Sequence, residues 1–131
     1  MKKIILDTNA YAGLLAGDQD VLSAISAAEI FYMYVFVLGE LHAGFAGGAK
    51  KRENKDTLQR FLMKPSVKIL NATTETAEVF GQVKFNLKRS GNPLPINDVW
   101  IAAHALETGS VVVTYDTHFE SIPGLRLWER V

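Results

Sequence analysis

Four carboxylates lie at the edges of predicted strands and helices, far apart along the chain. They are Asp7, Glu40, Asp98 and Asp116. Carboxylate oxygens are the ligands that hard cations such as Mg²⁺ prefer, and cations held by several acids suit phosphodiester chemistry. Whether these acids can act together depends on the elements that carry them.

Each acid taken alone has an ordinary structural explanation. Asp7 can satisfy backbone donors in a turn, and Asp98 can favour the dipole of a helix N-terminus. Glu40 can be solvated, and Asp116 can shape a loop. Taken together they favour a different interpretation, because four acids crowded at one edge repel one another unless a cation neutralises them.

Strand and helix patterns alternate along the chain. Short apolar and β-branched runs predict strands at 3–6, 30–35, 67–70 and 111–114, with a further candidate at 125–128. Helical spacing of apolar residues predicts helices at 10–15, 18–28, from 37 to the glycine pair 47–48, 51–63, 74–87 and 98–108. We expect Asp18, Thr74 and Asn97 to cap the helices that follow them.

This alternation predicts an α/β fold, a three-layer α/β/α sandwich around a mainly parallel sheet of four to five strands. In such folds ligands bind beyond the carboxyl ends of the strands. Asp7 follows the first strand directly, and Asp116 comes two residues after the fourth, so both should emerge at that edge. Glu40 lies one turn into a helix that starts there, and Asp98 lies in the first turn of another. All four acids can therefore converge.

Length and composition bound the class of protein. With 131 residues, of which 48% are hydrophobic, the chain fits one domain spanning residues 1–131. The absence of cysteine excludes disulfides and thiolate metal sites. No apolar stretch resembles a membrane span, and the apolar run after Lys2 and Lys3 is too short for a signal peptide. We expect a cytoplasmic protein that does not bind membranes.

Overall charge does not point to nucleic acid, because 14 basic and 14 acidic residues cancel. One basic cluster nevertheless contains Lys84, Lys88 and Arg89. On a helix Lys84 and Lys88 share a face, from which they can contact phosphates beside a metal site. A solvated helix surface explains the same residues.

The three histidines differ in their relation to the acids. His42 and His104 are expected to point away from the nearest acid, as packing or surface residues. His118 lies near Asp116 in a loop and can reach the acids.

Four segments together resemble the PIN-domain ribonucleases. They are Asp7-Thr8-Asn9, Gly39-Glu40-Leu41, the run from Ile96 to Ala103, and the run from Thr114 to Phe119. The likeness is strongest to the VapC-type toxins of prokaryotic toxin–antitoxin pairs. The ending Ile122-Pro123-Gly124-Leu125 also resembles that group, so the resemblance covers essentially the whole chain.

The resemblance implies a metal-dependent endoribonuclease with the PIN fold, whose acids hold one or two Mg²⁺ or Mn²⁺ ions. The family's acidic set matches the four carboxylates, and its supporting positions match Thr8, Asn9 and Thr114. It further implies an RNA substrate, a VapB-like antitoxin that lies across the active-site groove, and a homodimer.

We expect metal-assisted hydrolysis, in which the cations bind a phosphate oxygen, lower the pKa of a bound water and stabilise the leaving oxygen. Asp7 and Asp98 are the expected direct ligands, because short side chains anchored at a strand end and a helix start are well placed. Glu40 and Asp116 are expected to bind a second ion or to act through water.

Two other classes of function stay open. A phosphatase or phosphotransferase of another acid-rich α/β fold can also begin with an acid after its first strand. The haloacid-dehalogenase kind, however, needs a second Asp where this chain has Asn9. A non-catalytic binding module could use the acids to grip a basic partner, and insensitivity to a chelator would distinguish it.

Overall fold

The computed structural model describes residues 2–129. In this part of the chain five parallel strands form one sheet in the order β3-β2-β1-β4-β5. The strands are β1 (Lys3–Leu6), β2 (Ile30–Tyr34), β3 (Val67–Leu70), β4 (Val111–Val113) and β5 (Arg126–Leu127). The chain builds outward from β1 in one direction and then, with β4, in the other. The order therefore reverses between β1 and β4, where open α/β sheets bind their ligands.

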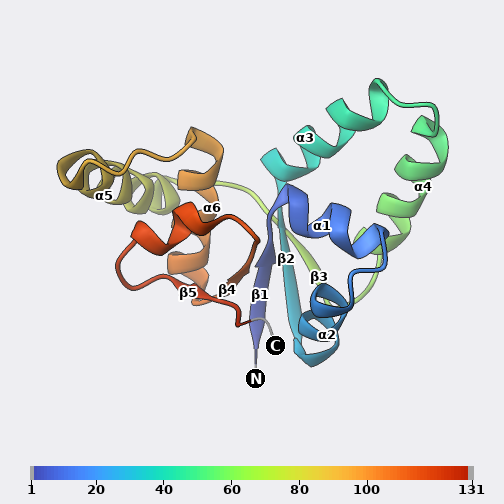
Figure 1. Cartoon of the computed structure of the whole chain (residues 1–131), viewed down its shortest axis with the longest axis horizontal. Coiled ribbons are helices and arrows are strands. Elements are labelled where there is room, and N and C mark those ends of the chain that lie inside the picture. Colours follow the sequence, from blue (N-terminus) through green and yellow to red (C-terminus); the bar gives the residue numbers. More distant parts are fainter. Residues whose placement is uncertain (1, 130–131) are drawn as a thin grey trace.

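Six α-helices and one 3₁₀ helix connect the strands within residues 2–129. They are α1 (Thr8–Leu15), α2 (Gln19–Ala27), α3 (Val35–Ala46), α4 (Lys51–Leu62), α5 (Thr74–Ser90), α6 (Ile96–Thr108) and η1 (Thr117–Ser121). Figure 1 shows α1 to α4 to the right of β1 and the pair α5 and α6 to the left.

Helices cover both faces of the sheet. Phe31 of β2 stacks on Phe61 of α4, with ring centroids 6.5 Å apart. Tyr34 of the same strand lies three residues later and points to the opposite face, where its ring is 4.3 Å from His104 of α6. The predicted three-layer sandwich with a parallel sheet is therefore confirmed.

The central strand is buried along its apolar run, as expected for a parallel strand covered on both faces. Ile4, Ile5 and Leu6 of β1 are at most 3% exposed. Leu6 pairs with Val113 of β4, so the residues that follow them, Asp7 and Thr114, leave the sheet side by side.

The helices α1 and α3 begin earlier than predicted. The first starts at Thr8 rather than Ala10, because the Asp7 side chain caps it by accepting the Ala10 amide. The third starts at Val35 rather than Val37, directly where β2 ends.

The cap predicted at Thr74 is wrong by one residue. Thr73 is the cap, and its hydroxyl accepts the Thr76 amide while the Thr76 hydroxyl accepts the Thr73 amide. This reciprocal capping box sets where the helix begins. The cap predicted at Asp18 is confirmed.

The cap predicted at Asn97 is also wrong. The helix already begins at Ile96, because the Pro95 carbonyl accepts the amides of Asp98 and Val99 at 3.0 and 3.2 Å. Asp98 consequently lies at the third helical position, still within the first turn. None of the helices in residues 2–129 has the length and apolar character needed to cross a bilayer.

Candidate active site

Asp7 is buried at the junction of β1 and α1, with 6% of its surface exposed. One carboxylate oxygen accepts the Ala10 amide at 2.8 Å, and the other accepts the Thr114 hydroxyl at 2.5 Å. Burial raises the pKa of Asp7, the two hydrogen bonds oppose that shift, and the negative charges of Asp116 and Glu40 add to it. Asp7 is held in one orientation in a setting that disfavours its charge.

Thr114 connects Asp7 to Asp116. Its hydroxyl donates to Asp7 and accepts the backbone amide of Asp116 at 3.0 Å. Asp116 in turn caps η1: its carboxylate accepts the His118 amide at 2.8 Å and lies 3.1 Å from the His118 ring nitrogen Nδ1. One hydroxyl therefore joins the ends of β1 and β4.

The other two acids project from helices. Asp98, in the first turn of α6, is partly buried, and its pKa is raised to about 6. Burial is the main cause, followed by the negative charges of Asp116, Asp7 and Glu40, while His118 acts in the opposite direction. The other three carboxylates therefore lie close enough to Asp98 to disfavour its charge.

Glu40 is exposed on α3, and its carboxylate accepts the Thr8 hydroxyl at 2.9 Å. Thr8 therefore contacts one of the four acids, and its supporting role stays a prediction. Asn9 is exposed on the first turn of α1. The fold thus brings the four predicted carboxylates, Thr8 and Thr114 to one edge, whereas their catalytic and metal-binding roles stay predictions.

The donor set fits a hydrated hard cation better than a fully enclosed one. Within residues 2–129 no three Asp, Glu or His side chains are arranged so that they could hold one metal ion directly. Burial first, and the negative charges of the other three acids second, nevertheless raise the pKa of Asp98, and a bound cation would offset this cost of the charged form. Mg²⁺ commonly retains several waters, which can bridge this wider spacing.

The three basic residues predicted to contact phosphates lie on α5 and are exposed. Lys84 and Lys88 border a cavity of about 220 Å³ that Val99 of α6, the residue after Asp98, also lines. The Arg89 guanidinium instead lies 5.9 Å from the Phe85 ring centroid. Contact of any of them with RNA stays a prediction.

The histidines lie as predicted. His104 is 1% exposed and packs on Tyr34, and His42 is exposed with its ring 5.8 Å from that of Phe45. His118 reaches the acids through its contact with Asp116.

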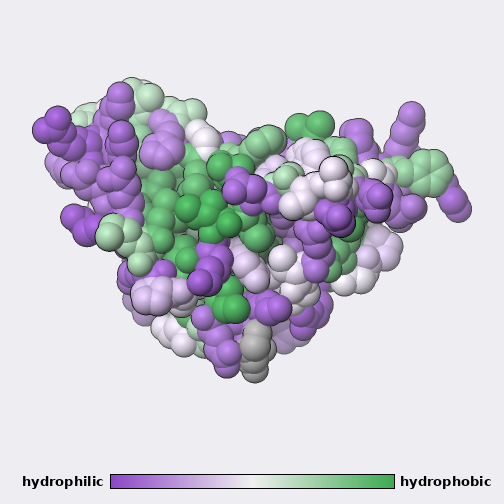
Figure 2. All heavy atoms as spheres, turned by 180° about the vertical axis from the view of Figure 1, so that it is seen from behind, coloured by the Kyte–Doolittle hydropathy of each residue, from purple (hydrophilic) through white to green (hydrophobic). Residues whose placement is uncertain are grey.

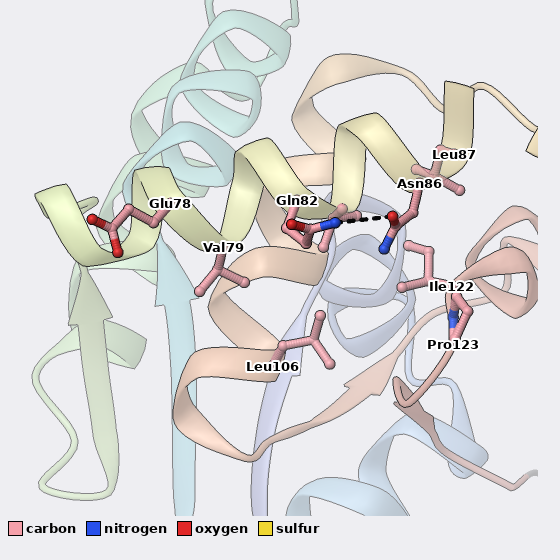
Figure 3. A pocket seen from close by; sticks show the side chains of 9 residues that line it. Glu78, Val79, Gln82, Asn86, Leu87, Leu106, Ile122 and Pro123 are labelled. Carbon is pink, nitrogen blue, oxygen red and sulfur yellow. Dashed lines mark hydrogen bonds between the residues drawn. The ribbon is translucent and has the colours of Figure 1, made fainter. Parts of the chain in front are cut away.

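A separate apolar cavity of about 370 Å³ lies between α5, α6 and the segment at Ile122 and Pro123 (Figure 3). Val79 and Leu106 point into it, and a hydrogen bond of 3.0 Å from Gln82 to Asn86 runs along its rim. Its lining contains none of the four acids. The edge that carries the acids is therefore distinct from this apolar cavity.

Two aromatic residues beside the acids were not predicted to take part. The Trp128 indole donates to the Thr114 carbonyl at 2.5 Å, and the Tyr115 hydroxyl donates to Asp18. Nothing in the spacing of the sequence identifies these contacts, because they depend on β5 pairing with β4 and on α2 lying near the end of β4.

Comparison with known proteins places this arrangement in a family. The model of the PIN domain matches residues 4–125. Ribonuclease VapC2 of Rickettsia felis is 30% identical over 97 residues, which cover 72% of this chain and 71% of the relative. The tRNA(fMet)-specific endonuclease VapC of Salmonella typhimurium is 29% identical over 130 residues and 97% of both chains.

A solved structure has the same fold. The crystal structure of DNA-bound VapBC from Salmonella typhimurium contains a chain with a TM-score of 0.84 and 28% identity, and the match covers 98% of each chain. Sequence and structure comparisons thus agree along nearly the whole chain. The chain belongs to the PIN-domain family, within its VapC-like group.

Proposed function

We propose that this protein is a metal-dependent endoribonuclease and the toxin component of a toxin–antitoxin pair. The observation that carries the proposal is the meeting of four carboxylates beyond β1 and β4, where the pKa of Asp98 is raised to about 6 partly by the other three. Such a cluster repels a phosphate backbone unless a cation neutralises it. A metal-dependent reaction on a phosphodiester accounts both for the meeting of the four acids and for their compatibility with a phosphate substrate.

The relatives support RNA as the substrate class. One is named a ribonuclease and another an endonuclease specific for tRNA(fMet). We extend to this chain only the class, RNA, because the particular target depends on groove shape and loop contacts.

Mg²⁺ or Mn²⁺, as one or two ions, is the proposed cofactor. Asp7 and Asp98 are the proposed direct ligands, with Glu40 and Asp116 acting at a second ion or through water. When bound, the cation supplies charge neutralisation at a phosphate oxygen and activation of water.

The side chains themselves contribute orientation. Asp7 cannot rotate without breaking a hydrogen bond to Ala10 or to Thr114, so its remaining lone pairs keep a constant direction. Glu40 is exposed and accepts a hydrogen bond from the Thr8 hydroxyl, so its carboxylate has room to adjust to a bound substrate.

We also propose a VapB-like antitoxin and a second copy of this chain as partners. The Salmonella structure is a VapBC complex, which supports the antitoxin. Exposed apolar side chains such as Phe36, which is 49% exposed, and Ile69, which is 48% exposed, are available for protein contacts. Figure 2 shows apolar residues gathered over part of the back of the molecule.

The test is cleavage of total cellular RNA by the purified protein with Mg²⁺, with Mn²⁺ and with a chelator. We expect cleavage with a metal, none with the chelator, and none by Asp98→Asn. Glu53→Gln, at an exposed acid of α4, is the matched control and should cleave like the wild type. Metal-independent cleavage or an active Asp98→Asn would refute the proposal, and binding of a basic partner without cleavage would favour the binding-module alternative.

A further inference from the structure

We propose that Trp128 is a positioning residue, which orients Thr114 and through it Asp7 and Asp116. The inference rests on the proposed function of the sheet edge that carries Asp7, Glu40, Asp98 and Asp116, which we call the acidic edge. It assigns a task to a residue outside these four acids. Trp128 follows β5 directly and is partly buried.

Trp128 is attached to β4 at two points. Its backbone amide donates to the Val112 carbonyl at 3.1 Å, which extends the pairing of β5 with β4. Its indole N–H donates to the Thr114 carbonyl at 2.5 Å. Within residues 2–129 the second bond lies beyond the last paired residue of β4, so the indole adds a hydrogen bond where the described strand pairing has ended.

Thr114 passes this constraint to two acids. The same residue whose carbonyl receives the indole proton donates its hydroxyl to Asp7 and accepts the Asp116 amide. Asp7 is also bound to the Ala10 amide and cannot follow a displaced Thr114. A shift of the Thr114 peptide therefore breaks the link between Asp7 and Asp116 rather than moving both together.

Tyr115 packs against the indole. Its ring meets that of Trp128 edge to face, with centroids 5.3 Å apart and planes at 78°. The Tyr115 hydroxyl donates to Asp18, whose carboxylate also caps α2 through the amides of Asp20 and Val21. The indole is thus held by its own backbone and by an aromatic ring that is anchored to α2.

The chain offers a matched control in its other tryptophan. Trp100 of α6 stacks on Phe80, with ring centroids 4.0 Å apart. A Trp-to-Phe change at either position keeps an aromatic ring, but only at position 128 does it remove a bond to the segment that carries Asp116.

The activity test compares Trp128→Phe with Trp100→Phe at a temperature at which thermal unfolding shows both to be folded. Trp128→Phe should lower kcat for RNA cleavage about tenfold with little change in KM, because substrate contacts remain while the acids lose alignment. Trp100→Phe should stay within about twofold of the wild type. Equal kcat for the two variants would overturn the proposal.

A double-mutant cycle tests the route through Thr114. If Trp128 acts through that residue, adding Trp128→Phe to Thr114→Val should cost less than about twofold, because the link to Asp7 is already absent. A full additional tenfold loss would contradict the route.

Hydrogen exchange tests the geometry without any catalysis. In the wild type the Trp128 indole proton should exchange slowly, and in Trp128→Phe the Asp116 amide should exchange about tenfold faster. An indole proton that exchanges as fast as one open to solvent would overturn the proposal, even if Trp128→Phe failed to fold. If the wild type cleaves no RNA with either metal, the proposed function fails while these exchange rates still decide the positioning role.

Discussion

The two sides of the acidic edge are held in different ways. On the strand side, Asp7 and Asp116 are joined through the Thr114 hydroxyl, and Asp7 has a further bond to a helix amide. On the helix side, Asp98 and Glu40 are placed mainly by the helices that carry them, and Glu40 gains one bond from Thr8.

Because the two sides are held differently, substitutions on one side should act through geometry and substitutions on the other through charge. The strand side is preorganised, so its substitutions should act by disturbing alignment. The helix side carries the clearest electrostatic penalty, since the pKa of Asp98 is raised to about 6 even though a helix N-terminus favours negative charge. Its substitutions should act through charge.

The largest expected effect is at the buried acid. Asp7→Asn removes the charge but keeps an oxygen that can still accept the Ala10 amide, so kcat/KM with Mg²⁺ should fall by about 10³-fold or more while the fold persists. Steady-state kinetics and circular dichroism check the two parts. Full activity in this variant would sink the assignment of Asp7 as a ligand.

The next largest effect should come from removing the Thr114 hydroxyl that links Asp7 to Asp116. Thr114→Val removes the hydroxyl but preserves the shape, and we expect kcat to fall by about 100-fold and stability by about 1–2 kcal/mol. Thr114→Ser, which restores the hydroxyl, should recover most of both. If serine and valine behave alike in kinetics and urea unfolding, the hydroxyl has no part in alignment.

Glu40→Gln should have a smaller effect. The amide oxygen can still accept the Thr8 hydroxyl, and the exposed side chain is proposed to act at a second ion or through water, so kcat/KM should drop by about tenfold. A loss larger than that of Thr114→Val in the same assay would reverse the comparison between the two sides.

The smallest expected effect concerns stability and pH without metal. The Asp98 carboxyl titrates near 3.8 when unfolded and at about 6 when folded, so the folded state binds more protons between these values. The favourable contribution of Asp98 to the stability of the folded state is therefore complete below pH 3.8 and is lost as the pH rises through about 6.

Asp98→Asn should therefore be more stable than the wild type at pH 8 in chelator, by about 1 kcal/mol after allowance for solvent screening. The two proteins should converge near pH 4, and added Mg²⁺ should narrow the gap at pH 8. Urea unfolding at both pH values measures the difference in stability. If the wild type instead gained stability relative to the variant as the pH rose between these values, the predicted sign would be wrong.

Much of the fold could be predicted because apolar periodicity reports burial. The run Ile4, Ile5 and Leu6 indicates a strand covered on both faces, and the strand is buried as expected. The start of α5 could not be assigned from Thr73 and Thr74 alone, because both can cap a helix. The reciprocal bonds with Thr76 decide between them.

The candidate site was likewise predictable only in part. Acid positions relative to predicted strand ends were enough to expect the four carboxylates at one edge. The contacts of Trp128 and Tyr115 were not predictable, because the partners lie 14 and 97 residues away along the chain. Such pairs are neighbours only after β5 has paired with β4 and α2 has packed near the loop.

The sequence by itself determined the alternation of strands and helices, the identity of the acids and the edge where they emerge, because these follow from local periodicity and from the direction of parallel strands. The tertiary structure alone decided which acids are tied together and which carry the charge penalty. Both depend on burial and on distances between segments that are remote in sequence, and no local pattern encodes them.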